Sequence, residues 1–262
     1  MIGFALFPYI ISLAFLPGIA GWSVSTDHKS PMEQRKTPDS RARASKIAAA
    51  KVPWVKNAGQ WEEDILYVAH SFTGNVIVNE AKEIIYALPV DSTSGYVLKE
   101  RFIGKRNRQK IPLGEKRSPS VFNYFIGNDK ASWRANVPSY EVLNMGDLWE
   151  GVTLKLKAHN DNVEKLFYVQ PNIAPQSIQI AVDGAERLEV SRNGRLVVHT
   201  PAGEIAYSAP VAYQWIDNEQ HFAKAQYKIA GKNTYTFLVE DYDPAYELII
   251  DPYVASTFMG DG

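Results

Sequence analysis

The sequence predicts an all-β protein, an antiparallel β-sandwich built from many short strands. Short runs rich in β-branched and aromatic residues recur from residue 52 onward. Turn residues separate these runs about every ten residues, a spacing that favours an antiparallel meander over βαβ units. No amphipathic helical run longer than two turns interrupts them. An arrangement of two packed lobes, divided at residues 104–120, is the alternative.

The first twenty residues have the layout of a secretory signal peptide. Residues 2–20 are nearly all apolar, and Gly18-Ile19-Ala20 is a small-residue triplet of the kind that precedes cleavage. No Lys or Arg precedes the apolar run. An uncleaved anchor is the alternative, because a spanning helix needs about 20 apolar residues. Pro8 and Pro17 within the run favour cleavage, which leaves no stable membrane span.

Residues 21–51 are polar and charged, contain two prolines and show no apolar periodicity. This composition is typical of a disordered, flexible linker. The β-module is predicted to follow at residues 52–254. Export places the chain outside the cell or at the cell surface, with the periplasm as the alternative.

The first strands are predicted from β-rich runs between turn residues. They are Ile65–Ala69, Asn75–Asn79, Glu83–Leu88 and Tyr96–Ile103. A basic, glycine-containing loop is predicted next, at residues 104–120. In Thr153–Ala158 apolar and polar residues alternate, so Leu154 and Leu156 are expected to face the core.

The later strands follow the same pattern. They are predicted at Val163–Gln170, Ser177–Val182, Arg187–Val190, Val211–Ile216, Phe222–Ile229 and Tyr235–Val239. Asn193-Gly194 is predicted to form a tight type I′ hairpin, because both residues tolerate positive φ. Asp217-Asn218 is predicted to form another turn.

Composition limits the function. The chain has 28 basic and 29 acidic residues and a net charge of -1, which gives no electrostatic reason to expect a nucleic-acid partner. It has no cysteine, which excludes disulfides, thiol catalysis and thiolate metal sites. No required cofactor and no zinc site are predicted, since the five histidines are scattered.

Aromatic residues are the best indication of a binding function. Trp133, Tyr140, Trp149 and Trp215, together with Tyr213, are candidates for a flat platform on which sugar rings stack. The competing interpretation is that these side chains fill the core, as large aromatic residues usually do. The platform predicts a carbohydrate-binding module with surface polysaccharide as its partner.

Two other kinds of chemistry are weaker alternatives. Asn160-Asp161-Asn162 and Asp241-Tyr242-Asp243 are rich in oxygen ligands and make calcium an alternative cofactor. The same residue types also favour turns. Paired carboxylates would suit a glycoside hydrolase. The candidates are Glu62, Glu63, Asp64, Glu141, Asp147 and Glu150.

Seven short strings, in order along the chain, carry a family resemblance. They are Asn57–Gln60, Asn123–Asn128, Trp133–Tyr140, Leu148–Leu154, Ala209–Gln214, Tyr242–Pro244 and Leu248–Pro252. This series resembles the N-terminal domain of bacterial SBBP-repeat proteins, which are large exported or cell-surface chains. The resemblance implies that a β-propeller of repeats follows the domain. Residues 255–262 look like the opening of a first repeat, although Asp261 replaces the glycine usual there.

The leading hypothesis is therefore a non-catalytic exported β-module that heads a cell-surface propeller-repeat protein. Its role would be structural, or interaction with neighbouring cell-envelope proteins. The resemblance implies no activity and no catalytic residues.

Overall fold

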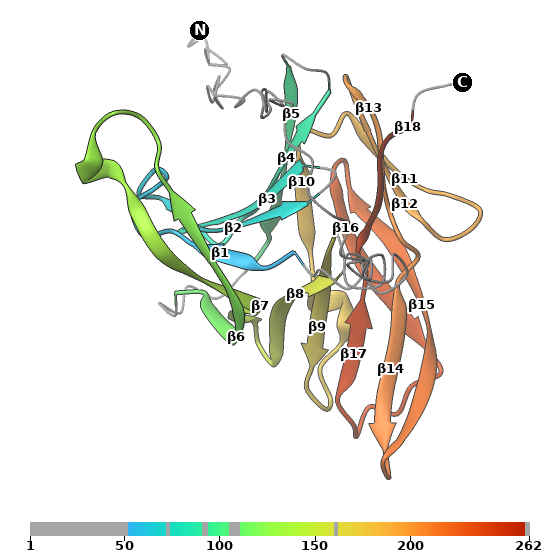
Figure 1. Cartoon of the computed structure of the whole chain (residues 1–262). Coiled ribbons are helices and arrows are strands. Elements are labelled where there is room, and N and C mark those ends of the chain that lie inside the picture. Colours follow the sequence, from blue (N-terminus) through green and yellow to red (C-terminus); the bar gives the residue numbers. More distant parts are fainter. Residues whose placement is uncertain (1–51, 72–73, 91–93, 105–110, 160–161, 260–262) are drawn as a thin grey trace, which may run out of the picture.

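The computed structural model describes residues 52–71, 74–90, 94–104, 111–159 and 162–259 (Figure 1). The predicted signal peptide and linker, residues 1–51, lie outside the described residues, as do residues 260–262 of the predicted repeat opening. The strands are β1 (Trp54–Lys56), β2 (Ile65–Ser71), β3 (Gly74–Asn79), β4 (Ile84–Pro89), β5 (Gly95–Phe102), β6 (Leu113–Tyr124), β7 (Arg134–Trp149), β8 (Val152–His159), β9 (Asn162–Val169), β10 (Ile180–Asp183), β11 (Arg187–Val190), β12 (Leu196–Thr200), β13 (Gly203–Tyr207), β14 (Val211–Ile216), β15 (Glu219–Gly231), β16 (Thr234–Glu240), β17 (Leu248–Asp251) and β18 (Val254–Met259). Two single-turn 3-10 helices lie at Lys130–Ser132 and Pro175–Ser177.

The strands form two antiparallel sheets, as the sequence predicts. A 14-stranded sheet has the order β1-β2-β3-β4-β5-β10-β16-β15-β14-β17-β9-β8-β7-β6. A 4-stranded sheet has the order β11-β12-β13-β18. Trp54 and Val55 of β1 also pair with Tyr140 and Ser139 of β7, so the large sheet returns onto itself. In Figure 1 the strands from β1 to β8 curve around one side, and β14, β15 and β17 lie side by side at the lower right.

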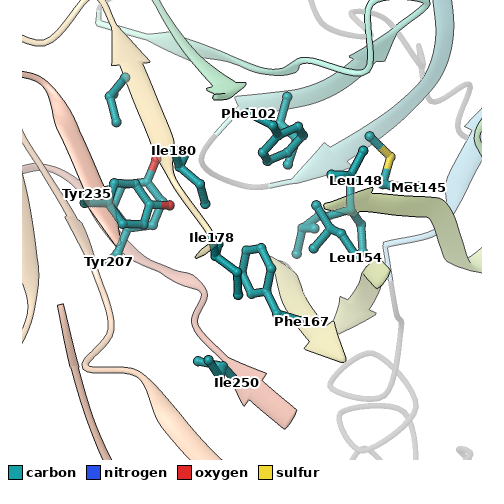
Figure 2. Close-up of a cluster of buried hydrophobic side chains, with 14 of the residues drawn as sticks. Phe102, Met145, Leu148, Leu154, Phe167, Ile178, Ile180, Tyr207, Tyr235 and Ile250 are labelled. Atoms are coloured by element: carbon teal, nitrogen blue, oxygen red, sulfur yellow. The ribbon is translucent and has the colours of Figure 1, made fainter. Parts of the chain in front are cut away.

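One continuous core joins these strands. It extends from Trp54 and Tyr86 near the start of the module to Phe237 and Ile250 near its end, and it includes Tyr207 of the small sheet. Figure 2 shows how side chains from distant segments meet there, with Phe167 between Ile178 and the Leu148 and Leu154 pair. Residues from both sides of positions 104–120, where the alternative of two packed lobes places its division, pack in one cluster.

In β8 the alternation of apolar and polar residues matches the side chains that face the core and those that face outward. Leu154 and Leu156 are fully buried, while Lys155 and Lys157 point outward and form ion pairs with Glu115 and Glu164. The prediction from the alternating run is confirmed.

The loop predicted at residues 104–120 is only partly a loop. Residues 105–110 lie outside the described residues, but β6 begins at Leu113 and pairs with β7 along most of its length. The strand forms because β7 offers a long partner edge, which the local sequence of the segment does not reveal.

The Asn193-Gly194 turn also differs from its prediction. Gly194 alone takes a positive φ (78°), and Val190 pairs with Leu196 across a loop of residues 191–195. Ser191 closes this loop by accepting at its Oγ from the Arg195 amide. The type I′ geometry appears instead at Asp217-Asn218, where φ is 51° and 65° and Ile216 pairs directly with Glu219.

Candidate interaction surface

The predicted aromatic residues lie in four different environments and do not form one platform. Trp149 ends β7 inside the core with only 4% of its surface exposed. Its ring packs edge-on against Phe102 at 5.5 Å, and its Nε1 donates to the Ile103 carbonyl at 2.8 Å. Trp149 is therefore a core residue, and the structure removes it from any exposed platform.

Tyr140 is half-buried on β7 and packs edge-on against Tyr67 at 6.1 Å. Its ring covers Gly114 of β6 so closely that a Cβ there would lie 2.4 Å from the Tyr140 ring. Tyr140 thus fixes the β6–β7 pairing. The side of its ring that faces Gly114 is therefore covered.

Trp133 is 36% exposed and sits where the β6–β7 hairpin turns. It packs against Phe125 at 5.2 Å, lies 5.9 Å from the Lys130 ammonium and donates to the Gly127 carbonyl. This small cluster stabilises the end of the hairpin.

Trp215 is 56% exposed and belongs to a larger aromatic set. On β14, Ala212 and Gln214 face the core, so Tyr213 and Trp215 face outward. Register pairs Tyr213 with Phe222 of β15 on one side and with Ile249 of β17 on the other. Ile249 in turn pairs with Tyr168 of β9.

Residues directly opposite one another on antiparallel strands project to the same side of the sheet. Phe222, Tyr213, Ile249 and Tyr168 therefore form one row across four strands, and Trp215 stands beside it. We call these five residues the outer aromatic face. The Tyr213 and Phe222 rings are 6.3 Å apart, and Phe222 is 68% exposed. Three inter-strand spacings separate β15 from β9, which gives the row a length of roughly 14 Å.

Local sequence explains how β14 and β15 present these rings. Asp217-Asn218 makes a two-residue turn with both φ angles positive, the geometry that matches strand twist in a hairpin. The turn fixes Trp215 opposite Gln220 and Tyr213 opposite Phe222. The Gln214 side chain holds the strand from within, because it donates to the Asp243 and Tyr246 carbonyls at 2.8 and 3.1 Å.

Hydrogen-bonding groups surround the row. Lys155 lies 5.7 Å from the Tyr168 ring and pairs with Glu115 at 2.9 Å. Next to Tyr168 in register, Thr153 donates to Asp147 at 2.6 Å. The flanking lysines have acidic partners, since Lys157 pairs with Glu164 and Lys224 with Asp241. The surface therefore offers polar groups of both signs.

The two tyrosines of the row keep their protons. Burial raises the pKa of Tyr213, and the Asp251 carboxylate raises it further. Burial also raises the pKa of Tyr168, against the lowering effect of Lys155. Burial raises the pKa of Glu247 as well, again opposed by Lys155. At neutral pH both phenols are neutral, so they can donate and accept hydrogen bonds.

A second polar cluster is buried in the core, and the sequence did not predict it. Lys165 of β9 and Glu100 of β5 form an ion pair of 2.6 Å with almost no exposed surface. Tyr235 donates to the same carboxylate oxygen at 2.7 Å, and Tyr86 donates to the other at 3.1 Å. The Lys165 ammonium also lies 4.3 Å from the centre of the Tyr207 ring.

Burial lowers the pKa of Lys165, and Glu100 counteracts that effect. Burial and then Glu100 raise the pKa of Tyr86, Tyr207 and Tyr235 well above the usual value. The alternation Val163, Lys165, Phe167, Val169 could have revealed this lysine, because it shares its side of β9 with three buried apolar residues. Full burial makes the cluster a structural element of the core.

The residues suggested for calcium have other partners. Asp241 pairs with Lys224 at 2.6 Å, and Asp243 accepts from the Ala245 amide at 2.9 Å. Asn160 and Asp161 lie outside the described residues, and Asn162 accepts from Val163 at 2.8 Å. Within the described ranges, no three His, Asp or Glu side chains are placed to hold a metal ion.

The carboxylates suggested for a hydrolase come from three segments. Glu62, Glu63 and Asp64 are exposed between β1 and β2. Glu141 and Asp147 lie on β7, and Glu150 follows in the turn to β8.

None of the helices in the described part of the chain has the length and hydropathy that a membrane crossing requires.

The fold and surface together define an antiparallel β-module with a solid core and an exposed aromatic face. The chain belongs to a family described as "Domain of unknown function (DUF7948)", whose model matches residues 54–253. No match was found among curated proteins or among solved structures.

Proposed function

We propose that this chain is a non-catalytic, exported interaction module that heads a cell-surface protein with propeller repeats. The resemblance of seven strings to the N-terminal domain of SBBP-repeat proteins supports this architecture. The course of the chain after β17 is the structural observation that carries the proposal.

After β17 the chain still contacts β9 of the large sheet, because Pro252 accepts from the Lys165 amide and Tyr253 bridges Glu164. It then forms β18, the last strand in the order of the small sheet. β18 pairs with β13 from Tyr207 and Val254 to Glu204 and Met259. An edge strand presents backbone N–H and C=O groups along its other side, which can receive another strand. The proposal is that repeats continue from this strand and that its edge is an interaction edge.

Light scattering on residues 52–262 tests this edge. Among the described strands β18 pairs on one side only, with β13. We expect concentration-dependent self-association, because such an edge strand pairs readily with a second copy. Consecutive residues of a strand direct their N–H groups to opposite sides. Of the variants Ser256→Pro and Thr257→Pro, one therefore removes an N–H group on the unpaired side of β18 and should abolish association without unfolding the protein. The other removes an N–H group on the side of β13 and should disrupt that pairing. A monomer at all concentrations would overturn the interaction edge.

Export is tested separately. Residues 1–25 fused to alkaline phosphatase, an enzyme that becomes active only in an oxidising compartment, should give activity in a bacterial host. Leu13→Arg and Leu16→Arg together interrupt the apolar run and should abolish that activity. Equal activity with and without the two arginines would contradict export by this segment.

A further inference from the structure

We infer that the outer aromatic face binds a neutral polysaccharide chain. This goes beyond the role proposed for the module as the head of a repeat protein, and it does not depend on the β18 edge. The inference rests on the shape of the face, its ring chemistry and its charge.

The face is elongated in the direction that crosses the strands. Phe222, Tyr213 and Tyr168 follow one another across the strands, and Ile249 between the two tyrosines is covered with 7% exposure. The neighbouring positions along β15 are polar, Gln220 on one side and Lys224 on the other. The row is roughly 14 Å long, with Trp215 next to Tyr213 on the same side of β14, and an elongated face of this kind can accommodate a linear polymer.

The chemistry of the rings suits sugars. The face of an aromatic ring carries negative charge density, which attracts the polarised C–H bonds on the flat side of a pyranose. Trp215, with 56% of its surface exposed, and Phe222, with 68%, offer such faces to solvent. Soluble proteins rarely leave a contiguous group of large apolar side chains exposed without a binding function.

The polar groups around the face supply hydrogen bonds without an excess of positive charge. The Tyr213 and Tyr168 hydroxyls, the Gln220 amide and the Thr153–Asp147 pair are donors and acceptors that match sugar hydroxyls. Lys155, Lys157 and Lys224 are each paired with a carboxylate. The site therefore has no excess of positive charge to attract an anionic polymer, and a neutral chain is the ligand it fits.

The test is native affinity electrophoresis of residues 52–262 in gels that contain laminarin, glucomannan, mannan or hydroxyethylcellulose, with alginate as the acidic polymer. We expect at least one neutral polymer to retard the protein. Trp215→Ala and Phe222→Ala should each weaken retardation by about tenfold or more. Tyr213→Phe keeps the ring and should retain most of the binding, whereas Tyr213→Ala should lose it.

Trp133→Ala is the matched control, since it removes an exposed tryptophan of the β6–β7 hairpin, which is not part of the outer aromatic face, and should leave retardation unchanged. Circular dichroism checks that each variant is folded, and the Trp215 emission should shift to shorter wavelength on binding. Retardation by alginate alone, by none of the polymers, or with equal strength in Trp215→Ala would overturn the inference. So would capture of a protein partner by this face with no polysaccharide binding.

Discussion

At the scale of single residues, the buried pair of Lys165 and Glu100 is the most unusual feature of the core. Two charges removed from water are costly unless each finds full compensation. Here Tyr86 and Tyr235 donate to the carboxylate, and the ammonium lies over the Tyr207 ring. The cluster joins β13 of the small sheet to β4, β5, β9 and β16, which lie at different positions in the large sheet.

We predict that Lys165→Met destabilises the protein by about 3–5 kcal/mol, because it leaves the Glu100 carboxylate buried without its counter-charge. Adding Glu100→Gln should recover a large part of that loss. A glutamine removes the orphaned charge, and its carbonyl can still accept from one of the tyrosine hydroxyls. Urea unfolding of the two single variants and the double variant measures the free energies of unfolding. A double variant no more stable than Lys165→Met would show that the pair is not the unit we describe.

At the scale of elements, the local pattern of apolar and polar residues predicts where strands form, but it predicts poorly which strands pair with one another. The alternation in β8 identified Leu154 and Leu156 as core residues because a half-buried strand separates polar and apolar sides. The pairing of β1 with β7 joins residues more than 80 positions apart, as Trp54 and Tyr140 show. No local pattern carries that information. The strand β6 was predicted as a loop for the same reason, since only β7 beside it makes it a strand.

The aromatic surface shows where the pattern misleads. In β14 the inward residues are Ala212 and Gln214, while the outward ones are Tyr213 and Trp215. The more hydrophobic side of this strand thus faces solvent, the reverse of the usual rule. The sequence identified Trp215 and Tyr213 as candidates but could not separate them from Trp149, which is buried. Phe222 and Tyr168 were missed because only the register across four strands brings them into the row.

At the scale of the whole molecule, the first strands of the module are held by contacts with strands from the second half of the chain. The Trp54 indole donates to the Leu156 carbonyl at 3.2 Å, 102 residues away. β5 pairs with β10 along Lys99–Phe102, and Arg101 binds Asp183 at 2.6 Å. Strands β1 to β5 pair with one another, and both β1 and β5 also pair with strands from the second half of the chain, β7 and β10.

This arrangement predicts one cooperative unfolding transition for residues 52–262. Tryptophan fluorescence, which reports on the buried Trp54 and Trp149 side chains, and far-ultraviolet circular dichroism should give coincident urea curves, the criterion for two-state behaviour. A fragment of residues 52–104 should be unfolded when produced alone, because Trp54, Tyr86, Leu98 and Phe102 lose the core residues that cover them. Two separated transitions, or a fragment with native-like dichroism, would instead favour two independent lobes joined near residues 104–120. Mixing the fragment with residues 111–262 extends the test, since recovery of the native spectrum only in the mixture would show that each part supplies the surface on which the other folds.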